Sequence, residues 1–192
     1  MNKKIKIFSA VLSLLTAVLF ASSVQAHDQN DEFHVAALIV KKTGITYMSA
    51  IEEARKAHPN GVVINYELES HDDEVFHEVK LVEVEEQRKY RIKVDAKTGK
   101  LLSESSESAT SWFGRNRHLE IATYMKKAGF RIEDAIQALQ VTNNMHIKEV
   151  EIEGKNGIRY AEVTALVDTG KQSWMVEIDS RQVIPFFKKH DR

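Results

Sequence analysis

The chain has 192 residues, of which 27 are Lys or Arg and 28 are Asp or Glu, and it contains no cysteine. Disulfides, thiol catalysis and cysteine-based zinc sites are therefore excluded, and the mixed charge argues against nucleic acid or anionic lipid, which require clustered Lys and Arg. With 8 glycines and neither a Gly-x-Ser-x-Gly nor a His-Glu-x-x-His motif, the sequence also shows no phosphate loop, nucleophile elbow or zinc-peptidase helix.

Residues 1–26 have the pattern of a signal peptide. Three lysines within the first six residues precede an apolar stretch from Ile7 to Phe20, and Val24-Gln25-Ala26 is typical of a cleavage site. The stretch is shorter than the roughly 20 apolar residues that a membrane span needs. We expect an exported protein, periplasmic or secreted, that begins near His27 and has no stable membrane insertion. A retained N-terminal anchor is the alternative.

The first predicted unit covers residues 33–103. An apolar run over 33–40 ends in two lysines and Gly44, which is typical of a helix terminus, and Thr46 can cap a second helix that stops near residue 58. The hydrophobic period then changes to two, which indicates half-buried strands over 62–69, 75–84 and 90–94. A turn over 95–100 leads into a short fourth strand.

Residues 104–117 are predicted to be a linker, because the segment 103–111 contains five serines and no large apolar residue. The second predicted unit, residues 118–188, repeats the order of the first. Its helices are expected over 118–127 and from 132 to about 141, and its strands near 146–153, 158–167, 173–178 and 182–187. We therefore expect two small domains in tandem.

The two units are also similar in sequence. An offset of 85 positions places Ala50-Ile51 on Ala135-Ile136, and an offset of 84 places Glu78-Val79 on Glu162-Val163 and Asp95 on Asp179. Repetition at a fixed period indicates copies of one structural unit. The predicted fold is α+β: two tandem repeats, each with one or two helices packed on an antiparallel meander of three or four strands.

Both units resemble the PepSY domain family. In the first unit the resemblance is carried by Ala50-Ile51, Phe76-His77-Glu78-Val79 and Tyr90 to Lys100, which ends in Asp-Ala-Lys-Thr-Gly-Lys. In the second it is carried by residues 135–136, 160–163 and 174–179, and Ser180-Arg181-Gln182 replaces the Thr-Gly turn. The resemblance implies a non-enzymatic binding or regulatory module. PepSY domains occur in propeptides of secreted thermolysin-like metalloproteases, where they are associated with inhibition and folding assistance, and as stand-alone envelope proteins.

Three residues are predicted to be structural in the turns after the third strands. Asp95 and Asp179 can each accept backbone N–H groups from the turn that follows, and Gly99 lies within the first of these turns. Neither aspartate has a second carboxylate beside it in a recognisable cleft pattern, so the sequence does not predict acid–base catalysis of the glycosidase type.

The predicted partner is a protein or peptide in the envelope, with inhibition or modulation of a peptidase as one form of the function. An exposed strand edge would pair with an extended segment of that partner, without any cofactor. Glutamates on the strands could present an acidic ribbon to a basic peptide, although a solvated sheet face explains them as well. The acidic ribbon consists of Glu67, Glu69, Glu78, Glu151, Glu153 and Glu162. The candidate contact residues are Trp112, Phe113, Glu78 and Glu162.

A metal-binding protein is the alternative hypothesis. His71 and His77 flank a run of acidic residues, a combination that can collect a divalent ion, although the spacing matches no standard site. Cleavage after Ala26 would also make His27 the first residue, whose amine and imidazole could chelate copper together with His34. A purely structural subunit of an envelope assembly is a third possibility.

Overall fold

The computed structural model describes residues 25–71, 74–110, 116–140, 145–155, 157–168 and 170–186. Within these ranges four helices and eight strands form an α+β fold, as predicted, and two helices followed by four strands occur twice in chain order. The elements are α1 (Gln25–Thr43), α2 (Tyr47–Ala57), β1 (Val62–His71), β2 (Glu74–Glu83), β3 (Arg88–Asp95), β4 (Leu101–Ser108), α3 (Arg117–Ala128), α4 (Ile132–Ala138), β5 (His146–Lys155), β6 (Ile158–Val167), β7 (Gly170–Glu177) and β8 (Val183–Phe186).

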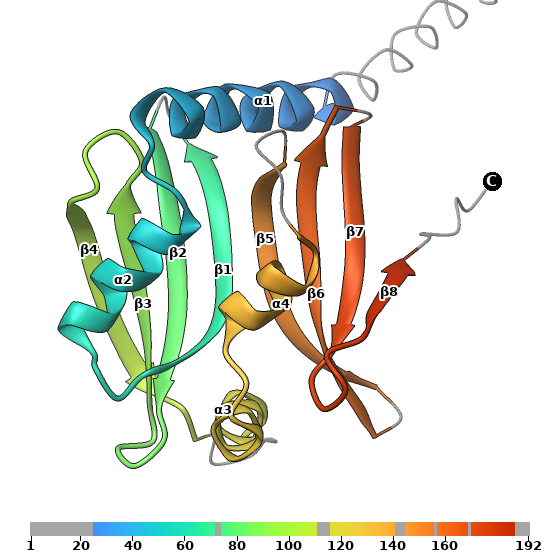
Figure 1. Cartoon of the computed structure of the whole chain (residues 1–192). Helices are drawn as coiled ribbons and strands as arrows, with labels where there is room; N and C mark the ends of the chain where they lie inside the picture. Colours follow the sequence, from blue (N-terminus) through green and yellow to red (C-terminus); the bar gives the residue numbers. More distant parts are fainter. Residues whose placement is uncertain are drawn as a thin grey trace, which may run out of the picture.

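The eight strands form one antiparallel sheet in the order β4-β3-β2-β1-β5-β6-β7-β8. Helices α2 and α4 lie on one face of this sheet, α1 crosses one end of the strands, and α3 lies near the other end (Figure 1). Tyr66, Val79 and Ile92 lie side by side on the face that α2 covers and are fully buried. We call the opposite face, which carries Glu67, Glu78 and their neighbours, the open face.

The two halves of the sheet join where β1 pairs with β5. Tyr66 lies opposite Val150, which follows it by 84 positions and is therefore its counterpart in the other half. A register shift at the start of β1, between Val63 and Asn65, recurs in β5 between Ile147 and Glu149. These correspondences support the predicted duplication, which itself stays a prediction.

The halves share one hydrophobic core as well as one sheet. Buried residues from α1, α2, β1, β2 and β3 belong to the same cluster as buried residues from α3, α4, β5, β6 and β7. Ile51 and its counterpart Ile136 both belong to it and are fully buried. Pairing of β1 with β5 thus joins the cores of the two predicted units, and the division of the chain into units 33–103 and 118–188 stays a prediction.

The predicted linker over 104–117 was wrong in its first part, since β4 extends through Ser108 and pairs with β3 along its whole length. The reason is physical. Every residue of β4 is exposed, so the strand needs no apolar residues and shows no alternating pattern. Helix α3 begins at Arg117, and residues 111–115 lie outside the described residues.

The third strand of each half does not follow the predicted offset. The connection between β2 and β3 has four residues, 84–87, whereas β6 and β7 are joined by two, 168–169. Asp95 lies opposite Phe76, and at the corresponding place Glu177 lies opposite Tyr160. A shift of two residues keeps each side chain on its face, so the hydrophobic pattern could not reveal it.

Candidate functional site

The outer edge of β4 is the longest exposed strand edge in the described structure. All eight of its residues are exposed, and none is a proline. The N–H of Ala109 donates to the carbonyl of Gln87 at 2.8 Å, which sets the phase of the ladder with β3. Because hydrogen bonding alternates along an antiparallel strand, the N–H groups of residues 103, 105 and 107 point to β3. Those of Glu104, Ser106 and Ser108 point outward.

The sheet's other edge is a poorer template for pairing. Strand β8 has four residues and includes Pro185, which has no N–H to donate. Short edge strands and prolines are features by which proteins prevent unwanted pairing. Strand β4 has neither protection and relies on Glu104 and Glu107.

Beside β4 on the open face, strand β3 presents three cations. Lys89 lies opposite Glu107 and forms an ion pair with it at 2.5 Å. Arg91 and Lys93 lie opposite Ser105 and Ser103, whose short side chains leave them uncovered from that direction. The side chain of Arg91 remains 51% exposed.

On the helix-covered face, His58 connects α2 to β4. Its Nδ1 lies 3.1 Å from Glu83 of β2, its Nε2 lies 3.3 Å from Glu104, and its ring packs on Tyr90 with the centroids 3.8 Å apart. His58 is the residue that ends α2 and is almost completely buried. These contacts hold β4 in position relative to the rest of the first half.

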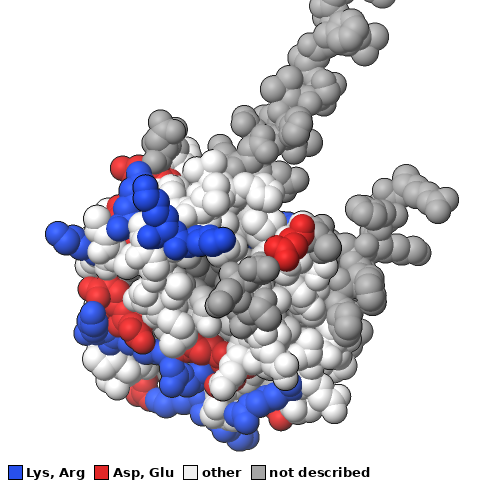
Figure 2. All heavy atoms as spheres, turned by 45° about the horizontal axis from the view of Figure 1, so that its top comes forward, with Lys and Arg blue, Asp and Glu red and all other residues white. Residues whose placement is uncertain are grey.

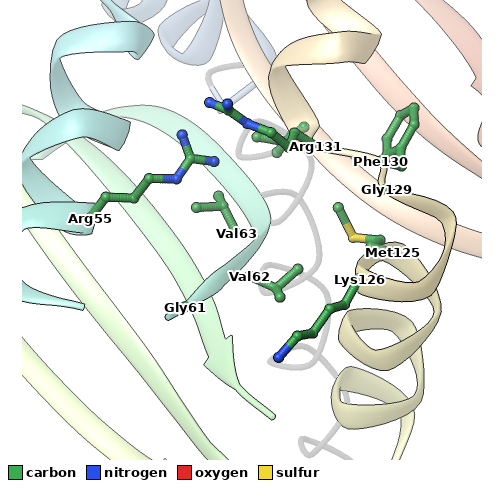
Figure 3. Close-up of a pocket in the computed structure, with 10 residues that line it drawn as sticks. Arg55, Gly61, Val62, Val63, Met125, Lys126, Gly129, Phe130 and Arg131 are labelled. Carbon is green, nitrogen blue, oxygen red and sulfur yellow. The ribbon is translucent and has the colours of Figure 1, made fainter. Parts of the chain in front are cut away.

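A groove of about 390 Å³ lies between the two halves on the helical side (Figure 3). Arg55 of α2 stands on one side of it, and Met125 and Lys126 of α3 stand on the other. The groove is lined by Arg55, Gly61, Val62, Val63, Met125, Lys126, Gly129, Phe130, Arg131 and Ile132. Its floor is thus largely apolar and its rim is cationic.

The rim cations of this groove already have partners in the chain. Glu133 accepts hydrogen bonds from both Arg55 and Arg131, and Lys126 pairs with Glu85. Burial alone would raise the pKa of Glu133, but the hydrogen bonds from the two arginines outweigh it and lower the pKa to about 2. These ion pairs connect the two halves of the molecule and occupy the cations at the rim of the groove. We therefore place the candidate binding site at β4.

Of the predicted partner contacts, Glu78 is not accessible. Its side chain is 4% exposed and is surrounded by Lys80 at 3.1 Å, Arg91 at 3.4 Å and Lys93 at 3.9 Å. The prediction that Glu78 faces a partner was wrong, because the sequence does not show that β3 places cations beside it. Trp112 and Phe113 lie outside the described residues.

Glu162 and the rest of the acidic ribbon do lie on the open face, around the junction of the halves. Glu162 is opposite Glu151, and Glu67 is opposite Glu149. Burial and neighbouring carboxylates raise the pKa of Glu67 and of Glu151. Like charges directly opposed across strands destabilise the pairing, so this ribbon weakens the junction.

The first predicted turn has the expected structure. The Asp95 carboxylate accepts the N–H groups of Lys97 at 2.8 Å and Thr98 at 2.6 Å, and these bonds lower its pKa against the opposing effect of desolvation. Gly99 has φ +71, and a Cβ there would lie 3.3 Å from Ile45 Cδ1. The Asp-x-x-Thr-Gly pattern thus identified both residues correctly.

Asp179 has a different role from the predicted one. Its carboxylate accepts the hydroxyl of Tyr124 at 2.5 and 2.6 Å. In the corresponding turn Glu177 accepts the N–H of Ser180 at 2.9 Å. Glu177 therefore replaces Asp95, and Arg181 with φ +57 stands where the first turn has a glycine.

The histidines of the metal hypothesis are not brought together. His77 is buried on the helix-covered face, while the pairing of β1 with β2 places the side chain of His71 on the open face. His34 is exposed on α1, and the side chain of His27 is outside the described part of the structure. No group of three or more His, Asp or Glu among the described residues is placed to hold a metal ion. The combination of His71 and His77 was therefore wrong.

His77 instead belongs to a buried hydrogen-bond chain. Its Nε2 lies 3.2 Å from the carbonyl of Ile45, which can only accept, so Nε2 carries the proton. Nδ1 then accepts the hydroxyl of Tyr66 at 2.9 Å. Desolvation lowers the pKa of His77 to about 4, so the imidazole is neutral at neutral pH.

Comparison with known protein families gives one match, which lies in the first half of the chain. Residues 44–104 match the family model PepSY, described as "Peptidase propeptide and YPEB domain". A solved structure described as a lipoprotein, CD1622 from Clostridium difficile 630, is 16% identical to this chain and has a TM-score of 0.44. The match covers 75% of this chain and 93% of that one. YpmB from Bacillus subtilis has 18% identity and a TM-score of 0.28, with coverages of 72% and 93%. No curated protein is significantly similar to the chain.

Proposed function

Residues 44–104 form a PepSY domain, and from this premise we propose that the protein binds an extended segment of a protein partner along the outer edge of β4. The bound segment would extend the sheet as an additional strand. Its binding is non-covalent and needs no catalytic residue or cofactor. The partner we propose is a peptidase of the cell envelope, in keeping with the family's description and with the signal-peptide pattern of residues 1–26.

The observation that carries this proposal is the unpaired side of β4. Glu104, Ser106 and Ser108 direct both their N–H and their carbonyl groups outward, because the two groups of one residue point to the same side of an antiparallel strand. Each main-chain hydrogen bond that forms there contributes on the order of 1 kcal/mol. Strand addition of this kind derives affinity from the backbone and specificity from alternate side chains.

The side chains beside the edge favour a segment with small or acidic residues on the open face. Arg91 and Lys93, which pair with Glu78 at 3.4 and 3.9 Å, outnumber this carboxylate and leave the open face beside β4 cationic. A basic residue in the same place would meet these cations. The acidic ribbon at the centre of the sheet, which the sequence suggested as a basic-peptide site, lies several strands away.

A proline at position 106 tests the proposal. Ser106→Pro removes an outward N–H and leaves the ladder with β3 intact, so it should block strand addition selectively. Ser106 also accepts a hydrogen bond from Arg88 at 2.7 Å, so Ser106→Ala is the matched control for loss of the hydroxyl. Circular dichroism and thermal unfolding of both variants establish that the fold is kept.

Binding to a secreted thermolysin-like metallopeptidase is then measured by calorimetry, together with inhibition of its activity. We expect the parent chain and Ser106→Ala to bind with equal affinity, and Ser106→Pro to bind at least about tenfold more weakly. Equal binding by all three chains would refute the β4 edge as the site. Absence of binding by the parent chain would refute the peptidase as the partner.

A further inference from the structure

A corner of the molecule beside the C-terminal end of α1 gathers lysines from two distant segments. The hydroxyl of Thr43 donates to the carbonyl of Ala96 at 2.9 Å, which holds the end of α1 against the turn between β3 and β4. The lysine corner, as we call it, consists of Lys41, Lys42, Lys97 and Lys100.

The lysine corner is exposed, and its cations lack salt bridges within the described part of the chain. All four lysines are exposed, and no carboxylate of the described residues forms a salt bridge with any of them. The nearest acid in the turn is Asp95, whose carboxylate is engaged by the N–H groups of Lys97 and Thr98. The charge of Lys41 is felt at His146, whose pKa is lowered by burial and by this lysine.

Exposed apolar side chains adjoin the lysine corner. On the outer face of α1, Val35 is 53% and Leu38 is 65% exposed, two turns and one turn before the lysines, respectively. Figure 2 shows Lys and Arg gathered on this side of the molecule, with some Asp and Glu next to them on one side and uncharged surface on the other. Leu101 and Leu102, directly after the turn, are about half exposed as well.

We propose that the lysine corner and the outer face of α1 dock on a membrane surface that contains anionic phospholipid. Ammonium groups next to exposed apolar side chains are the combination that interfacial helices use: the apolar groups enter the boundary of the acyl chains and the lysines contact phosphates. No helix of the described residues is long and apolar enough to span a membrane. The docking is therefore peripheral.

The charge distribution along α1 also orients the docked molecule. Lys41 and Lys42 lie in the last turn of the helix, next to the turn that carries Lys97 and Lys100. An anionic surface therefore attracts this end of the molecule. Strand β4 starts beside the corner, so its outer edge would run away from the membrane and stay open to a partner.

The test uses a fluorescent reporter on the outer face of α1. In the full chain, Leu38→Trp places an indole at the proposed contact, and its emission is recorded during titration with vesicles. The vesicles consist of phosphatidylcholine alone or of phosphatidylcholine mixed with phosphatidylglycerol. We expect a blue shift with the mixed vesicles that is lost in high salt, because screening weakens the attraction. Any contribution of residues 1–24 is common to all chains compared.

Matched double variants identify the lysines. Lys41→Gln with Lys42→Gln should weaken the partition onto mixed vesicles by about fivefold per lysine. Lys126→Gln with Lys127→Gln changes the net charge equally at the corresponding place in α3 and should leave the partition nearly unchanged. Equal weakening by both pairs, or an equal shift with phosphatidylcholine alone, would overturn the proposal. A shift of the indole emission with polyglutamate but not with vesicles would also overturn the proposal, because it would indicate that the lysine corner binds an acidic protein and not a membrane.

Discussion

Arg55 at the end of α2 and Glu133 at the start of α4 form a two-bond ion pair between the halves of the molecule, with Nη2 and Oε2 3.0 Å apart. The side chain of Glu133 is 11% and that of Arg55 25% exposed, so water screens the pair only partly. A second arginine, Arg131, pairs with the same carboxylate. This contact and the pairing of β1 with β5 hold the two halves of the molecule together.

Glu133→Gln is expected to lower the free energy of unfolding by about 2 kcal/mol, because it leaves two guanidinium groups without their anion. Since the pKa of Glu133 is lowered to about 2, the contribution is fully present above pH 4.5 and is lost as the pH falls toward 2. Urea unfolding at pH 7 measures it. Glu53→Gln, which removes an exposed pair with Lys56, is the control and should have a much smaller effect on stability. Equal losses would show that Glu133 has no special role.

His77 should make stability depend on pH between 6.5 and 4. The folded protein keeps this imidazole neutral down to about pH 4, whereas the unfolded chain protonates it near 6.5. The unfolded state therefore binds more protons in this range, and stability falls with decreasing pH by on the order of 3 kcal/mol in total. Above pH 6.5 the contribution is constant.

His77→Gln tests this, because an amide can donate to Ile45 and accept from Tyr66 without titrating. Denaturant unfolding from pH 7 to 4 should give a flatter profile for the variant than for the parent. His118 and His146 also have lowered pKa values, through desolvation first, and they remain in both chains. Parallel profiles would mean that His77 is protonated in the folded state.

The two turns after β3 and β7 should respond oppositely to substitution. Gly99→Ala places a side chain at φ +71 with its Cβ close to Ile45, and we expect a loss of about 1 to 2 kcal/mol. Arg181→Gly relieves a non-glycine residue at φ +57 and should gain up to about 1 kcal/mol. Thermal unfolding of the two single variants provides the measurement. Destabilisation by Arg181→Gly would indicate that its contacts with Gly129 and Asp134 outweigh the backbone strain.

The junction of β1 and β5 should be strengthened by removing one of two opposed carboxylates. Glu67 and Glu149 are directly paired, and the pKa of Glu67 is raised by burial and by Glu149. Glu149→Gln is expected to raise the free energy of unfolding by about 0.5 kcal/mol. The gain should shrink as salt is added, because screening already reduces the repulsion in the parent chain. A gain independent of salt would exclude repulsion as its cause.

The sequence predicted the elements that have one buried face. Alternating apolar residues identified β1 to β3 and β5 to β7, and the Asp-Ala-Lys-Thr-Gly run identified the turn held by Asp95. It predicted only a short fourth strand and a linker from residue 104, because an edge strand exposed on both faces needs no apolar residues. It also aligned Asp179 with Asp95, since a shift of two residues leaves the hydrophobic pattern unchanged.

Contacts between segments far apart in the sequence were beyond prediction. Whether β1 pairs with β5 is decided by backbone groups at two strand edges, which leave no trace in the side-chain pattern. Glu78 became inaccessible through cations of β3, and the lysine corner arose from α1 and a turn more than 50 residues later. The charges had to be placed in space before either cluster could be recognised.

Amide hydrogen exchange along β4 is the most direct measurement of the proposed function. It is followed by nuclear magnetic resonance in the free protein and with the thermolysin-like metallopeptidase bound. Strand addition should slow exchange at Glu104, Ser106 and Ser108, whose N–H groups point outward, and leave residues 103, 105 and 107 unchanged because they already bond to β3. Unchanged exchange at the three outward amides while the peptidase is bound would contradict the account.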